Sequence, residues 1–211
     1  PLIWVHLRST YVDLPVGLLS AALVVTLLRD GERPPFLAVL LGVVLAAFKD
    51  EGLLHVLSAT VAALTVRGWR SWRLMLPAGA ALLAAGAWRL LLSLHAVADR
   101  DHAVGAPAFG EAGHVLKLLA LHLFDLHSWG VFWAFALAAL ALAKTELARG
   151  LRLALLGLFA VTFCALLLGP ERVRVFAENG TLLNRLLLQL WPTAALLIAS
   201  AWPKAHDVTK R

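Results

Sequence analysis

The segment Leu151–Gly169 reads LRLALLGLFAVTFCALLLG and carries one charged residue, Arg152. A helix needs roughly 20 apolar residues, within a range of about 17–25, to cross the hydrocarbon core of a bilayer. The chain contains four similar runs, which are Tyr11–Leu28, Leu74–Leu94, Trp129–Ala143 and Thr181–Trp202. Of its 211 residues 61% are hydrophobic and 15% are charged, whereas soluble domains are about 25% charged. The composition argues strongly against a soluble enzyme, and the sequence predicts an all-α transmembrane bundle that forms one domain over residues 1–211.

The stretch Pro35–Val66 is too long for one membrane span and contains the charged tetrad Lys49-Asp50-Glu51-Gly52. The apolar halves on its two sides, Phe36–Phe48 and Leu53–Val66, have 13 and 14 residues, so each would reach only about 20 Å as a helix. We expect two short helices that share the tetrad as their tip. With the five long runs, the prediction is about seven membrane helices.

Basic residues indicate the orientation of the bundle, because short cytoplasmic loops are enriched in Lys and Arg. Such residues gather in Arg67–Arg73, in Lys144–Arg152 and in the tail Pro203–Arg211. The sequence predicts a multi-pass protein of the inner membrane with a cytoplasmic C-terminus. The net charge of +6 is thereby explained without a nucleic-acid partner. The single cysteine, Cys164, excludes a disulfide scaffold.

Ionisable side chains at membrane depth are costly, and each one is a candidate functional group. Here they gather toward the predicted outer face, together with three polar neighbours. The candidates are Tyr11, Asp13, Lys49, Glu51, Arg89, Asn184, Arg185 and Gln189. We expect the first four of them to line one cavity on the outer side.

Each candidate also has a simpler interpretation. Asp13 can stabilise the N-terminus of its helix through the helix dipole. The tetrad that holds Lys49 and Glu51 can be a solvated turn. Arg89 and Arg185 can extend to the lipid headgroups while their aliphatic stems stay in the membrane. For Arg185, the polar neighbours and the following Trp191-Pro192 pair also permit an inward-facing site.

Two patterns raise the question of a divalent metal ion. Asp99 and Asp101 form an Asp-x-Asp pair in the long outer connection, and such a pair can hold a cation that neutralises a phosphate. His122 and His127 lie about 140° apart on a helix and cannot chelate one ion without distortion. Because polar loops often contain an Asp-x-Asp triplet, Asp99 and Asp101 are only weak metal candidates. The sequence indicates no cofactor.

Three patches, YVDLP at Tyr11–Pro15, FKDEGL at Phe48–Leu53 and TLLNRLLLQLWP at Thr181–Pro192, together resemble sequences of the GT-C superfamily of membrane glycosyltransferases, in particular bacterial relatives of the dolichyl-phosphate-mannose–protein mannosyltransferases. The stretch Tyr11–Pro15, YVDLP, resembles the family's Y-A-D-L-P helix opening. Phe48–Leu53, FKDEGL, resembles its T-K-N-E-G-L patch, with Phe for Thr and Asp for Asn. Thr181–Pro192, TLLNRLLLQLWP, is similar to the T-S-x-x-R-L-L-L-Q-L-x-P start of its last helix.

This resemblance implies an enzyme that transfers a sugar from a polyprenyl-phosphate donor, at the outer face, to a lipid, glycan or protein acceptor. Lys49, Arg89 and Arg185 would then be cations near the leaving phosphate, and Asp13 or Glu51 could assist the acceptor hydroxyl. The family's catalytic carboxylate lies in a first outer loop that these residues do not include. We therefore expect this chain to be the C-terminal part of a longer protein, with the catalytic residue N-terminal to Pro1.

Two other functional classes stay open. A secondary transporter would use broken helices at the membrane midplane, usually within an internal repeat. Pro15, Pro77 and Pro192 could break helices, but the sequence shows no such repeat. A non-catalytic subunit of a membrane complex is the third possibility.

Overall fold

The computed structural model describes residues 13–29, 36–48, 50–69, 71–95, 108–142, 144–169, 175, 177–178 and 181–201. The all-helical prediction is confirmed throughout these residues. The α-helices are α2 (Asp13–Arg29), α3 (Phe36–Phe48), α4 (Asp50–Arg67), α5 (Leu76–Leu94), α6 (Ala112–Leu123), α7 (Leu126–Trp129), α8 (Phe132–Leu142), α9 (Glu146–Leu168) and α11 (Thr181–Ala201). Two 3-10 helices, η1 (Trp72–Met75) and η2 (Phe109–Glu111), precede α5 and α6.

The stretch 35–66 divides into two helices, as the sequence predicts, but only α3 is short, with 13 residues, whereas α4 includes part of the charged tetrad and has 18. Lys49 lies outside the described residues, and Glu51 and Gly52 belong to the first turn of α4 rather than to a separate loop. Gly52 is required at this point, because a Cβ atom there would collide with the carbonyl oxygen of Leu45 in α3. The missing side chain lets the start of α4 lie directly against the end of α3.

Within the described residues, three helices are long and apolar enough to cross a membrane. They are Trp72–Leu94, Glu146–Leu168 and Leu182–Ala201. The apolar helices α3 and α8 are shorter than a full span. Large apolar side chains such as Leu83 and Leu94 on α5 are exposed, which suits a surface against lipid. These features agree with a membrane protein, and the count of about seven membrane helices stays a prediction.

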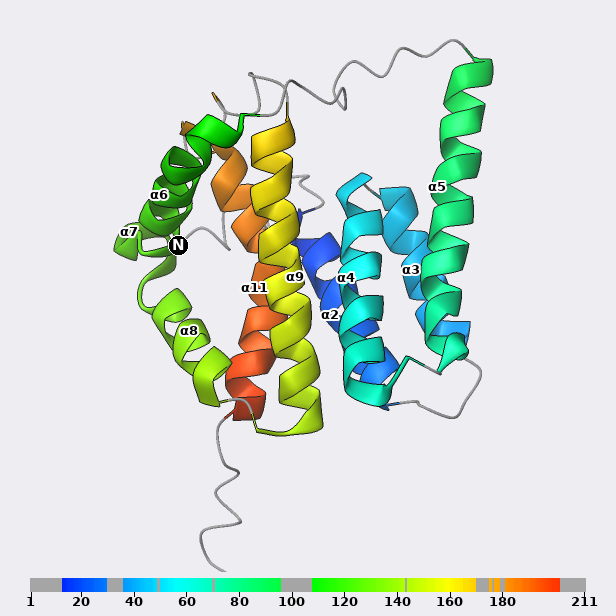
Figure 1. The fold of residues 1–211 in the computed structure, drawn as a ribbon, viewed down its shortest axis with the longest axis horizontal. Coiled ribbons are helices and arrows are strands. Elements are labelled where there is room, and N and C mark those ends of the chain that lie inside the picture. The colour runs from blue at the N-terminus through cyan, green and yellow to red at the C-terminus, as the bar shows by residue number, and fades with distance from the viewer. Residues whose placement is uncertain are drawn as a thin grey trace, which may run out of the picture.

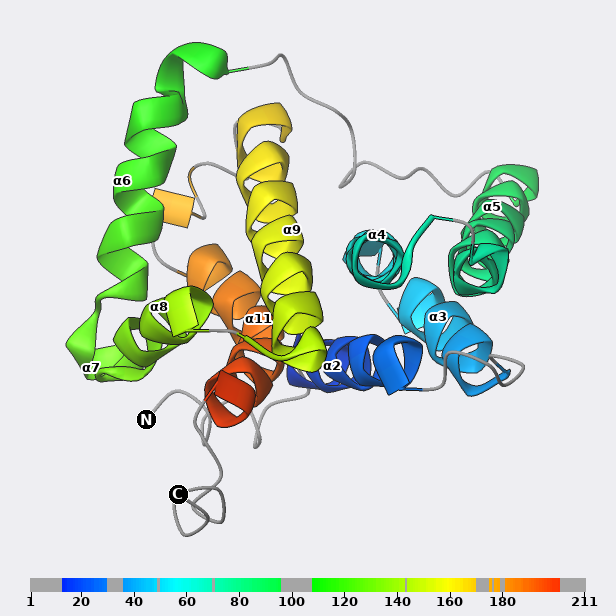
Figure 2. The ribbon, with the colours of Figure 1, turned by 60° about the horizontal axis from the view of Figure 1, so that its bottom comes forward.

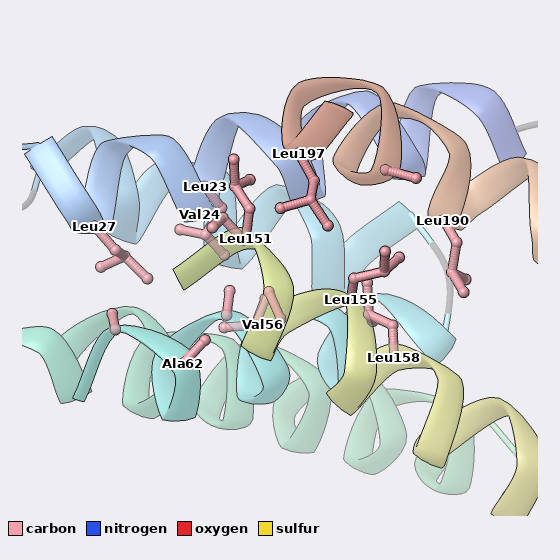
Figure 3. Close-up of a cluster of buried hydrophobic side chains, with 14 of the residues drawn as sticks. Leu23, Val24, Leu27, Val56, Ala62, Leu151, Leu155, Leu158, Leu190 and Leu197 are labelled. Carbon is pink, nitrogen blue, oxygen red and sulfur yellow. The ribbon is translucent and has the colours of Figure 1, made fainter. Parts of the chain in front are cut away.

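The helices α2, α4, α9 and α11 form the centre of the bundle (Figures 1 and 2). The pair α3 and α5 packs on one side of it, and α6, α7 and α8 lie on the other. Figure 3 shows the central core, in which leucine side chains from α2, α9 and α11 meet small residues of α4. The buried residues labelled there are Leu23, Val24, Leu27, Val56, Ala62, Leu151, Leu155, Leu158, Leu190 and Leu197.

Contacts at the two ends of the bundle define the direction of its helices. At one end Asp13, in the first turn of α2, meets Arg185, in the first turns of α11. At the other end the Arg67 guanidinium, at the end of α4, donates to the carbonyl oxygen of Leu28 near the end of α2. The central helices α2, α4 and α11 therefore run in the same direction. The polar residues described next lie toward the end at which these three helices begin.

Candidate functional site

The centre of the candidate site is Asp13, whose side chain is fully buried in the first turn of α2. Arg185 donates its Nε–H to Asp13 Oδ2 at 2.7 Å. Gln189 donates its side-chain amide to the other oxygen, Oδ1, at 2.8 Å. Arg185 and Gln189 reach the same carboxylate because residues four apart lie on one face of a helix. The structure thus brings together three of the residues singled out by sequence.

His55 extends this cluster to a third helix. Its Nε2 atom lies 3.0 Å from Oε1 of Gln189, and its side chain is 4% exposed. The sequence alone does not single out His55, because a single histidine in the apolar stretch of α4 matches no motif. The sequence signal that could have identified His55 is its position one helical turn after Glu51, since residues four apart on a helix share a face. Asp13, Arg185, Gln189 and His55 are called the ionic cluster below.

A close approach of α2 and α11 makes the ionic cluster possible. Gly17 lies one turn after Asp13, and a Cβ atom there would be 2.5 Å from the Gln189 carbonyl oxygen and 3.0 Å from Cδ of Pro192. No residue larger than glycine fits without a shift of the backbone. Small residues at helix interfaces in membrane proteins allow the two backbones to approach in this way.

Asn184 faces a different side of α11. Its Oδ1 accepts a hydrogen bond from the indole Nε1–H of Trp129 at 3.3 Å. The Trp129 ring stands edge-on to Trp133 at a centroid distance of 5.8 Å, and Phe132 lies 5.7 Å from Trp191. Asn184 therefore helps to hold α7 and its aromatic neighbours against α11. The sequence placed Asn184 in the same candidate site as Arg185, whereas in the structure the two side chains have different partners.

Arg89 is exposed on α5, the helix that packs against α3 and α4. It lines a cavity of about 290 Å³ together with Ala46, Leu53 and Trp88. The helix α5 packs on α3 and α4, whereas α11 packs on α2, α8 and α9. Figures 1 and 2 both show α4 between α5 and the centre of α11. The structure therefore does not bring Arg89 into the ionic cluster.

The remaining predicted residues divide into two groups. Glu51 is half-buried in the first turn of α4, four positions before His55. Tyr11, Lys49, Asp99 and Asp101 lie outside the described residues. Within the described part of the chain, no group of three His, Cys, Asp or Glu residues is close enough to hold a metal ion.

The geometry of the ionic cluster limits what its members can do chemically. Asp13 accepts hydrogen bonds at both oxygens and is fully buried, so it is poorly placed to remove a proton from an acceptor. The Arg185 side chain is 34% exposed and can meet a ligand at the surface of the bundle. A guanidinium is always charged, and its planar donors suit phosphate oxygens. This end of the bundle can therefore bind an anion through Arg185, with Asp13 as its internal counterion.

Comparison of the chain with protein-family models, with curated proteins and with solved structures gives no match. The class that the fold defines is an all-helical protein with helices long and apolar enough to cross a membrane.

Proposed function

We propose that the protein is an integral membrane glycosyltransferase. It transfers a sugar from a polyprenyl-phosphate donor to an acceptor at the outer face of the membrane. In this proposal the bundle has about seven membrane helices, and the end at which α2, α4 and α11 begin faces outward. The proposal takes its reaction class from the resemblance of the three patches, at Tyr11–Pro15, Phe48–Leu53 and Thr181–Pro192, to the GT-C enzymes.

The observation that supports it most directly is the Arg185–Asp13 pair at 2.7 Å. Two residues from separate family-like patches meet at one end of the bundle. One of them is a partly exposed guanidinium at the start of a membrane-length helix, where a lipid phosphate would present its charge. Charge that develops on a leaving phosphate is stabilised by a cation held in place before the reaction. Asp13 and Gln189 would position Arg185, and the donor would contact Arg185 itself.

A secondary transporter is the second candidate, and the buried members of the ionic cluster favour it. Intramembrane carboxylates and histidines often mark ion or proton pathways. Asp13 and His55 are buried and joined through Gln189. A transporter would use this connection to bind a coupling ion, and it would not cleave a sugar–phosphate bond.

The deciding experiment is a transfer assay with the full-length protein in lipid nanodiscs. It is supplied with a polyprenyl-phosphate-linked sugar, and sugar release or transfer is measured. Enzymatic release supports the proposal. No release from a panel of such donors, combined with ion-driven solute uptake in proteoliposomes, would establish the transporter instead.

Arg185→Lys is the discriminating variant for donor binding. Lysine keeps the charge but cannot hold two phosphate oxygens in the same plane. We expect the loss to be about 2–4 kcal/mol of transition-state stabilisation, or roughly 30- to 1000-fold in rate. If Arg185 only extends to the lipid headgroups, lysine replaces it and the activity stays within about threefold of the wild type.

A further inference from the structure

We propose that His55 is a positioning residue for Arg185 and acts on it through Gln189 and Asp13. This inference rests on the proposed function, because it assigns to His55 a role in orienting the cation that binds the donor phosphate. His55 lies on α4, Gln189 and Arg185 lie on α11, and Asp13 lies on α2. One line of hydrogen bonds thus joins three helices of the central bundle.

The direction of each bond in this line follows from the chemistry of the groups. An ionised carboxylate only accepts hydrogen bonds, so the Gln189 amide must turn its NH2 group toward Asp13 Oδ1. Its carbonyl oxygen then faces His55, where only a donor can satisfy it. The His55 ring must therefore carry a proton on Nε2. The donors run from His55 to Gln189 and from Gln189 to Asp13, and Arg185 donates to the second oxygen of the same carboxylate.

Burial makes this arrangement specific. The side chains of His55, Gln189 and Asp13 are 4%, 1% and 0% exposed. A buried amide that loses its hydrogen-bond partner is destabilised, because no water replaces the partner. Without His55, one of the two hydrogen bonds that fix the orientation of the Gln189 amide is lost, and its NH2 group is held less firmly at Asp13 Oδ1. The contact that fixes the carboxylate at Oδ1 is then weakened, and the geometry of the Arg185 Nε contact at Oδ2 is held less closely.

A less fixed Arg185–Asp13 contact changes the position of the exposed part of Arg185. This side chain is 34% exposed, so packing alone does not fix its rotamer. Misplacement of a positioning group by about 1 Å can reduce a rate by roughly 100-fold. We expect His55→Leu to lower kcat/KM for the polyprenyl-phosphate donor by about 10- to 100-fold.

The chain offers matched variants for this test. His55→Gln keeps an amide donor of similar reach, and we expect it to restore activity to within about fivefold of the wild type, because a neutral donor to Gln189 is retained. His55→Asn carries the same amide on a shorter side chain and should behave like His55→Leu. Thr60→Val is the control on the same helix. The Thr60 side chain is 4% exposed, and its hydroxyl has no hydrogen-bond partner among the described residues. This variant should leave the donor kinetics unchanged.

A double variant separates positioning from a general structural effect. If His55 acts through Arg185, then His55→Leu has little further effect on kcat/KM in an Arg185→Lys background. Residues of one network show such non-additive behaviour, whereas independent sites add. Fully additive losses, or equal losses for His55→Gln and His55→Leu, would overturn the proposal.

Binding of a polyprenyl phosphate without sugar, measured in nanodiscs, distinguishes this proposal from the proposed function. If His55→Leu and His55→Asn weaken that binding and His55→Gln and Thr60→Val do not, positioning by His55 is supported even where no sugar transfer is found. Equal affinity of the wild type and His55→Leu would reject positioning by His55 while sugar release still supports the glycosyltransferase.

Discussion

Arg185 donates its Nε–H at 2.7 Å to Asp13, a residue 172 positions away in the chain. Asp13 is fully buried and Arg185 is partly exposed, so the pair connects the interior of the bundle to its surface. The other carboxylate oxygen of Asp13 accepts a hydrogen bond from Gln189, which lies one helical turn after Arg185. The pair therefore stabilises the contact of α2 with α11 and at the same time limits the orientations open to the guanidinium.

Replacement of Asp13 should destabilise the protein. Asp13→Asn keeps the shape, but its NH2 group would face a donor from Arg185 or Gln189, and the guanidinium would lose its internal counterion. Removing one member of a buried pair costs about 3–5 kcal/mol, and the partial exposure of Arg185 reduces this to about 1–3 kcal/mol of unfolding free energy. The thermal midpoint in detergent should fall accordingly. The double variant Asp13→Asn/Arg185→Gln should recover part of the loss, and a double variant that loses the full sum would contradict the pairing.

Gly17→Ala should be destabilising, since its Cβ would lie 2.5 Å from the carbonyl oxygen of Gln189. Forcing one extra methyl group into a packed interface typically costs about 1–3 kcal/mol. Gly79→Ala in α5 is the matched control, because a Cβ atom there meets nothing within 4 Å. It should be neutral or stabilise by up to about 1 kcal/mol, from the lower backbone entropy of the unfolded chain. Equal midpoints for the two variants would show that α2 and α11 do not approach closely at Gly17.

Asp125 provides a test by pH at the start of α7. Hydrogen bonding holds the pKa of its carboxyl below the ordinary value, chiefly from the Ser128 hydroxyl at 2.6 Å and also from the backbone N–H of His127. A lowered folded-state pKa means that this cap stabilises α7 above the ordinary pKa of about 4 and is lost as the pH falls through the folded value. Ser128→Ala should raise the pKa of Asp125 toward its ordinary value. A carboxyl ¹³C titration measures the shift, and an unchanged titration curve would show that Ser128 makes no such contact in solution.

The predicted orientation can be tested with single cysteines at Ser71 and Val104 in a Cys164→Ala background. The native Cys164 is exposed, and its replacement leaves each variant with one thiol. Because Lys and Arg gather in the loops of the Ser71 side, we expect Ser71→Cys to label only from the cytoplasm and Val104→Cys only from outside. Labelling of both from the same side would refute the seven-helix topology.

The sequence by itself determined the helical class and the approximate positions of the long apolar helices, whereas the predicted run Trp129–Ala143 is interrupted by a turn between α7 and α8. Long apolar runs such as Leu151–Gly169 have no alternative to helix in a bilayer, because every backbone polar group must be satisfied within the segment. The charged tetrad correctly divided the stretch 35–66 into two helices. The shared face of Arg185 and Gln189 also follows from sequence, since four residues make about one helical turn.

Only the tertiary structure decided which residues Arg185 and Gln189 contact. Local periodicity fixes the face on which a side chain lies but not the helix that packs against it, and His55 is 134 positions from Gln189. That choice depends on side-chain packing across the bundle, above all on the close approach at Gly17. The same packing places Arg89 on α5, away from the ionic cluster, and turns Asn184 toward Trp129. Asp13, Arg185, Gln189 and His55 come together because burying polar groups in an apolar interior costs free energy unless they satisfy one another.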